Sequence, residues 1–165
     1  MPLLKNGSIV EDPWVALADG DAPPEGKPLL VSLTRFQAER ATLVARGVPL
    51  GVKVPNTTDV ATLAPDFGTL GLVALVFPKF NDGRAFSQAR LLRERHGFKG
   101  EIRATGAVLR DQLLFMQRCG FDAFEIVNQD AVAAWRAALA EIQVFFQPTG
   151  DGRATAPLLR RAAGR

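Results

Sequence analysis

Charged side chains follow directly after an apolar run in segment 72–84, where the run leads into Lys79, Asp82 and Arg84. Lysine and arginine bind oxyanions through charge-assisted hydrogen bonds, and an aspartate can act as a general acid or base. We expect residues 82–84 to open a helix, whose backbone N–H groups would add donors for an anion. This segment therefore predicts a site for a small anion.

Further candidates stand at the ends of other expected strands. Small ligands of parallel sheets bind where strands end and the loops to the helices begin. We take Lys79, Asp82 and Glu125 as the catalytic candidates. The ligand-binding candidates are Lys53, Lys79, Arg84, Arg103 and Asn128, and Thr105 lies on the same strand as Arg103.

Each candidate also has a structural interpretation. Asp82 before Gly83 suits a helix N-cap, and Lys79 suits either a Schiff-base lysine or a solvated loop residue. Arg103 suits either ligand binding or an ion pair with Glu125 on the neighbouring strand. The sequence leaves these alternatives open, and with them the question of whether the protein is an enzyme.

Five alternations of a strand and a helix are expected to position these residues. The strands begin near residues 29, 49, 71, 101 and 122, and the helices cover 34–46, a short stretch from 58 to 65, 83–95, 107–118 and a segment capped by Asn128 or Asp130. This order predicts a mostly parallel sheet with right-handed crossovers. We expect part of a TIM-like barrel, since a complete one needs about 250 residues. An open doubly wound sheet is the alternative.

Local patterns predict smaller features. Asn6-Gly7 between two short apolar runs indicates a β-hairpin, and Thr34 with Gln37 forms a capping-box pattern for the first long helix. In the last helix the expected buried stripe consists of Val132, Trp135, Leu139 and Ile142, and segment 144–146 is expected to add a strand.

Length and composition indicate one domain, at 165 residues with 47% hydrophobic and 22% charged side chains. We expect an α/β domain over 1–150, with the hairpin and a loop extension over 1–28, followed by a basic, flexible tail over 151–165. The tail carries four arginines against one aspartate, so 4 − 1 = +3 accounts for the whole net charge of +3. Because the body is then neutral, nucleic-acid binding is not expected.

The chain has one cysteine, Cys119, and one histidine, His96. These counts argue against a disulfide framework, a self-contained iron–sulfur cluster or a cysteine/histidine zinc site. No dinucleotide-binding, Walker-type or nucleophile-elbow motif occurs, so no cofactor and no metal are evident. The chain shows neither a signal-peptide pattern nor an apolar run able to span a bilayer, and we expect a cytoplasmic protein without membrane contact. The edges of an incomplete barrel invite pairing, and we expect either the N-terminal hairpin or a second copy of the chain, in a homodimer, to cover them.

Five segments together resemble an uncharacterised bacterial family of unknown function, DUF934. They are Phe77-Pro-Lys-Phe-Asn-Asp-Gly-Arg84, Ser87-x-Ala-Arg-Leu-Leu-Arg93, Gly97-Phe-x-Gly-Glu-Ile-Arg-Ala104, Val108-Leu-Arg-Asp-Gln112 and Arg118-Cys-Gly-Phe-Asp-Ala-Phe124. Members of the family are commonly labelled as oxidoreductases of sulfite reduction, and their genes often lie beside that of the assimilatory sulfite reductase haemoprotein.

This resemblance implies an accessory role in sulfur metabolism, with sulfite reductase or its electron donor as the partner. The arginines of helix 83–95 or the basic tail would provide the docking surface. The alternative is an enzyme or binding protein that holds a small anion, such as sulfite, through the strand-end lysine and arginines. The family supplies no catalytic residues to carry over.

Overall fold

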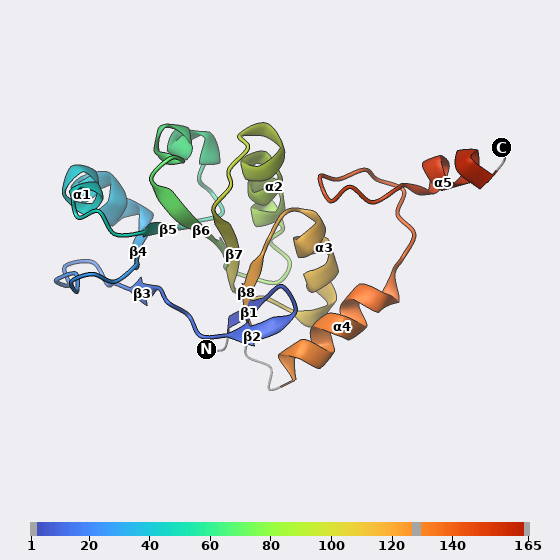
Figure 1. The fold of residues 1–165 in the computed structure, drawn as a ribbon, viewed down its shortest axis with the longest axis horizontal. Helices are drawn as coiled ribbons and strands as arrows, with labels where there is room; N and C mark the ends of the chain where they lie inside the picture. The colour runs from blue at the N-terminus through green and yellow to red at the C-terminus, as the bar shows by residue number, and fades with distance from the viewer. Residues whose placement is uncertain (1–2, 127–129, 164–165) are drawn as a thin grey trace.

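An eight-stranded sheet that curls into a half-barrel forms the centre of the molecule (Figure 1). The structure is a computed structural model that describes residues 3–126 and 130–163. The strand order is β2-β1-β8-β7-β6-β5-β4-β3. The strands from β3 to β8 are parallel, whereas β1 (Leu3–Lys5) pairs antiparallel with β8 and with β2 (Ser8–Val10). The predicted α/β class and partial barrel are confirmed.

Five strand–helix units build the parallel part of the sheet, in the order that the sequence predicts. Their strands are β4 (Leu29–Ser32), β5 (Leu50–Val54), β6 (Leu70–Phe77), β7 (Glu101–Gly106) and β8 (Ala123–Glu125). The helices are α1 (Leu33–Ala45), η1 (Val60–Asp66), α2 (Arg84–Arg90) with its π-helical continuation η2 (Leu91–Arg95), η3 (Arg110–Gln112) with α3 (Leu113–Arg118), α4 (Ala131–Glu141) and α5 (Ala156–Ala163). The short strand β3 (Val15–Ala16) was not predicted.

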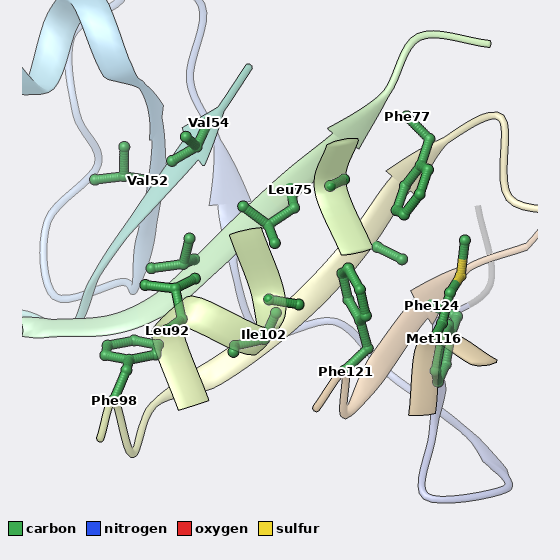
Figure 2. Packing of buried hydrophobic residues seen from close by; sticks show 14 of the residues in the cluster. Val52, Val54, Leu75, Phe77, Leu92, Phe98, Ile102, Met116, Phe121 and Phe124 are labelled. Atoms are coloured by element: carbon green, nitrogen blue, oxygen red, sulfur yellow. The ribbon is translucent and has the colours of Figure 1, made fainter. Parts of the chain in front are cut away.

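The main core lies between the convex face of the sheet and the helices (Figure 2). On β5, β6 and β7 the fully buried Val52, Leu75 and Ile102 face it, alternating with residues of the opposite face. The concave face carries only a small apolar cluster, of Leu30, Leu72 and Ala74 under Trp14. A doubly wound sheet would have helices on both faces. Here the described helices pack against the convex face, which leaves the concave face accessible to a ligand.

The hairpin at the N-terminus has the predicted turn. Asn6 and Gly7 have φ angles of 51° and 81°, the left-handed conformations that a type I′ turn requires. A Cβ atom at Gly7 would lie 2.8 Å from the indole nitrogen of Trp135, so α4 packs closely under this turn. Through Leu3 and Leu4 the hairpin covers the edge of β8, which a half-barrel would otherwise expose.

Two local predictions are wrong. Helix α1 begins after Ser32 rather than at Thr34, because the Ser32 hydroxyl accepts a hydrogen bond from the Arg35 N–H at 3.0 Å. Segment 144–146 is not a strand, since Phe145 forms only an isolated bridge with Thr155.

Helix α4 buries a narrower stripe than expected. Trp135 is buried as predicted, but its buried companions are alanines, namely Ala131, Ala134 and Ala138. Val132 and Leu139 are half-buried and Ile142 is exposed. The small alanine side chains allow α4 to pack closely against the rest of the domain, and the larger Val132, Leu139 and Ile142 then lie at the edges of this contact.

A C-terminal arm, residues 142–163, follows α4 and extends beyond the helices that cover the sheet (Figure 1). Arg118 holds its first half: Nε donates to Asp151 at 2.8 Å, Nη2 donates to the Gln147 carbonyl at 2.9 Å, and the guanidinium lies 3.7 Å from the centre of the Phe145 ring. The contact with Asp151 therefore involves the first residue of the predicted flexible tail, and α5 lies further along that tail. The flexibility of the tail stays a prediction.

Candidate functional site

The strand β7 divides its side chains between the two faces of the sheet. Ile102 and Ala104 are fully buried in the main core, whereas Glu101, Arg103 and Thr105 lie on the concave face. This alternation is the ordinary two-residue period of a strand. It places three polar side chains in a row on the face that no helix covers.

Arg103 is the centre of an ion-pair network on this face. Its side chain is 0% exposed, and it binds Asp12 with both terminal nitrogens, at 2.6 and 2.9 Å. Nε donates to Glu101 at 2.9 Å, and Nη1 lies 3.5 Å from Glu125. The predicted ion pair between Arg103 and Glu125 is therefore present, and three carboxylates surround one guanidinium.

Residues distant in sequence complete the network. Asp12 comes from the loop between β2 and β3, and Lys5 of β1 binds Glu101 at 2.6 Å. Burial raises the pKa of Asp12, but the hydrogen bonds from Arg103 and from the Trp14 N–H, with the charge of Arg103, outweigh burial and lower that pKa overall. The network thus ties the N-terminal segment to the concave face of the sheet.

A pocket of about 300 Å³ opens on the concave face beside this network. Four strands contribute its polar wall: Ser32 from β4, Lys53 from β5, Thr105 from β7 and Glu125 from β8. These positions are at or near the carboxyl ends of parallel strands, where ligand sites of such sheets occur. The apolar part of the wall includes Leu30 and Ala74.

Lys53 is the cation of this pocket, and the part of the chain that the structure describes offers it no partner. It is exposed and makes no hydrogen bond or ion pair with any residue of the described ranges 3–126 and 130–163. Opposite charge is supplied by Glu125, whose Oε2 accepts the Thr105 hydroxyl at 2.5 Å. An unpaired ammonium can bind an anionic group, and a carboxylate held by a hydroxyl can accept or return a proton.

The loop that follows β6 holds the other candidates and does not line this pocket. Arg84 binds Asp82 with two nitrogens, at 2.9 and 2.7 Å, and these hydrogen bonds hold the pKa of Asp82 well below its usual range. The interpretation of Asp82 as the N-cap is wrong by one residue, because Gly83 is the N-cap of α2. Asp82 still accepts a hydrogen bond from the Arg84 N–H at 3.4 Å. Lys79 is exposed on this loop.

The structure therefore separates the predicted site residues into two groups. Lys53 and Glu125 line one pocket, with Arg103 beside it, whereas Lys79 and Asp82 lie on the loop after β6 and Arg84 opens α2. Asn128 lies outside the described residues. The catalytic and binding roles assigned to these residues stay predictions.

Sequence reasoning missed Asp12, Glu101 and Lys5. Glu101 had a usable signal, because it stands two residues before Arg103 and so shares its face of the strand. Asp12 had none, since it is 91 residues from Arg103 in a loop without a periodic pattern. Around these carboxylates and elsewhere in the described residues, no group of three or more His, Cys, Asp and Glu is arranged to hold a metal ion.

A second hollow, of about 370 Å³, lies between η2, α3 and the C-terminal arm. Its arginines already have partners: Arg93 donates to the carbonyls of Phe98 and Gly100, at 2.6 and 2.8 Å, and Arg118 holds the arm. Burial raises the pKa of the Cys119 thiol in its wall, which disfavours the reactive thiolate. This hollow is therefore a junction between elements rather than a site for an anion.

The fold and the pocket define an α/β half-barrel protein with a polar cavity at the carboxyl ends of its strands. The family model described as bacterial protein of unknown function, DUF934, matches residues 51–157 of the 165. The chain belongs to this family. A search of curated proteins found no match. No helix within the described ranges is long and apolar enough to cross a membrane.

Proposed function

We propose that this protein is an accessory protein of assimilatory sulfite reduction, which binds a small ligand with an anionic group in the concave pocket. The sequence segments that resemble the family support the pathway, because members of that family are commonly labelled as oxidoreductases of sulfite reduction. The pocket supports the ligand. In this proposal the redox cofactor belongs to the partner, sulfite reductase or its electron donor.

The unpaired Lys53 is the observation that carries the proposal. Arg103, next to the pocket, is in contrast engaged by three carboxylates. A lysine left without a partner in a concave pocket can form charge-assisted hydrogen bonds with a ligand without first breaking an ion pair. The strand-end position matches the place where ligands of parallel sheets bind.

Calorimetric titration tests the ligand part of the proposal. Sulfite, sulfate and short organic sulfonates and carboxylates are titrated into the wild type, Lys53→Met and Lys27→Met. Lys53→Met keeps an apolar stem of similar length but removes the charge, and Lys27 is an exposed lysine that does not line the pocket. We expect saturable binding of at least one of these molecules that Lys53→Met abolishes and Lys27→Met preserves. Absence of binding by every molecule would refute the proposed pocket.

The C-terminal arm is the docking surface that the structure favours. In helix 83–95, Arg90 pairs with Glu94 at 3.0 Å and Arg93 is held by backbone carbonyls. These two arginines are engaged within the molecule, whereas Arg95 at the end of the segment is exposed. On α5, in contrast, Arg160 and Arg161 are exposed beside the exposed Leu158 and Leu159. An apolar stripe with adjacent positive charge suits an acidic groove on a partner.

Co-purification with sulfite reductase tests this docking surface. We expect the double reversal Arg160→Glu and Arg161→Glu to abolish the association, and Arg136→Glu, an exposed charge on α4, to preserve it. Growth of a deletion strain on sulfate as the only sulfur source tests the pathway. Unimpaired growth of that strain, together with no association, would remove the pathway assignment.

A further inference from the structure

We infer that the ligand of the concave pocket is dipolar, a short amino acid or aminosulfonate whose anionic group binds Lys53 and whose ammonium group binds Glu125. This inference rests on the proposed function, because the same pocket and the same lysine hold the anionic group. It goes further in naming the class of ligand and a second residue that selects it.

The charges around the pocket do not suit a purely anionic ligand. Lys53 is balanced by Glu125 in the pocket wall, and Asp19 stands just outside, where its carboxylate accepts the hydroxyl of the lining residue Ser32 at 2.7 Å. A sulfate or sulfite ion would be attracted by one ammonium and repelled by two carboxylates. A ligand with both charges satisfies Lys53 and Glu125 together, so charge complementarity favours it.

Arg103 does not correct this balance, because its charge is already neutralised. Asp12, Glu101 and Glu125 all lie within 3.5 Å of its guanidinium nitrogens, and its side chain has no exposed surface. A ligand therefore cannot reach Arg103 directly. Its role toward the pocket is to hold Glu125 in place.

Glu125 is arranged to accept a further hydrogen bond. Its Oε2 takes the Thr105 hydroxyl at 2.5 Å, its Oε1 lies 3.5 Å from Arg103, and the side chain remains 19% exposed. An ionised carboxylate offers about four acceptor sites, so two protein partners leave room for an ammonium group. Thr105 and Arg103 fix the carboxylate before the ligand arrives, which lowers the cost of ordering it.

Part of the pocket wall is apolar, which suits the carbon chain of such a ligand. Ala74 of β6 stands in register between Lys53 and Arg103, and its methyl group leaves space that a larger side chain would fill. With Leu30 it gives the wall an apolar part. The volume of about 300 Å³ lies at the small end of the roughly 300–1,000 Å³ usual for ligand pockets.

Matched pairs of probes test the inference by calorimetry at pH 7. The pairs are 2-aminoethanesulfonate against ethanesulfonate and alanine against propionate, with sulfite and sulfate as inorganic anions. We expect the dipolar member of at least one pair to bind about tenfold or more tightly than its partner, because its ammonium group forms a charge-assisted hydrogen bond with Glu125 that the partner cannot form. Lys53→Met should abolish binding of both members.

Glu125→Gln provides the decisive comparison. It keeps the size of the side chain but removes the charge. The affinity for the dipolar ligand should therefore fall about tenfold, and the affinity for the anionic ligand should stay unchanged or rise. Lys53-dependent binding of sulfite, sulfate, ethanesulfonate or propionate that equals or exceeds binding of the dipolar probes would overturn the inference and leave the proposed function standing. Binding of none of the probes would overturn both. Circular dichroism checks that Glu125→Gln is folded, and the wild-type ranking of the pairs decides the inference even if it is not.

Discussion

Replacing Arg103 by methionine should destabilise the protein strongly, because it leaves three carboxylates without their common cation. Removing one partner of a buried ion pair costs about 3–5 kcal/mol. The exposed fractions of Asp12, Glu101 and Glu125 are 34%, 8% and 19%, so water can compensate the first carboxylate better than the other two. Lys5 still neutralises Glu101 in the variant. We therefore expect a loss near the lower end, about 3 kcal/mol at pH 7.

The pH dependence of this loss identifies its cause. In the wild type Arg103 lowers the pKa of Asp12, so the stabilisation from this carboxylate is lost as pH falls below the unfolded-state pKa of about 3.9 and through the lowered folded-state pKa. The variant lacks that stabilisation and therefore loses less on acidification. The difference between the two proteins should therefore shrink on acidification. If Arg103 stabilised the protein only through packing, the difference in unfolding free energy between wild type and variant would not depend on pH.

Urea unfolding followed by circular dichroism at pH 7 and at about pH 3, below the unfolded-state pKa of about 3.9, measures both quantities. For a chain of this length, about 3 kcal/mol corresponds to a melting temperature lower by roughly 6–12 °C. Arg84→Met is the matched control, since its ion pair with Asp82 is at the surface, and we expect little change from it. A loss below about 1 kcal/mol at pH 7, or an equal loss at both pH values, would refute the argument that Arg103 neutralises the network.

Three further measurements test other parts of the structure. Gly106→Ala should lower the free energy of unfolding in urea by about 1–3 kcal/mol, because Gly106 has φ +94° and a Cβ there would clash with the Phe77 carbonyl oxygen. Gly68→Ala, where a Cβ meets nothing within 4 Å, should not destabilise the protein. Arg118→Met should speed hydrogen exchange of residues 145–155 and leave β6 and β7 unchanged, and equal exchange in the arm would contradict its tethering by this residue. The ionised Asp12 carboxylate stabilises the wild type above the unfolded-state pKa of about 3.9, and this stabilisation is lost as pH falls through the lowered folded-state pKa. Asp12→Asn should remove it, so the wild type should be more stable than the variant at neutral pH and lose this advantage in acid. A wild-type advantage that grows below pH 4 would contradict this prediction.

The strand–helix order was predictable because it depends on local patterns. Apolar runs, helical spacing and turn residues such as Asn6-Gly7 act over a few positions, and the strands lie within one or two residues of where they were expected to begin. The errors arose where two local solutions compete. Ser32 and Thr34 can both cap a helix, and the strand end at Ser32 decided between them.

The site was harder to predict, because its chemistry depends on which charged groups pair. Lys79 and Arg84 looked like the strongest anion ligands in the sequence, but the structure pairs Arg84 with Asp82 and leaves Lys79 exposed on its loop. Arg103 was expected either to bind a ligand or to form an ion pair with Glu125. The ion pair is present, and Asp12, which no sequence pattern connects with Arg103, takes both of its terminal nitrogens.

The sequence by itself determined the α/β class, the five strand–helix units and the residues at the strand ends, because apolar alternation in strands and helix capping depend on residues close in sequence. Only the tertiary structure decided that the helices cover one face and leave the other open to Lys53 and Glu125. Only the tertiary structure decided, too, that the N-terminal loop neutralises Arg103. Charge pairing acts through space, and its partners here lie up to 96 residues apart.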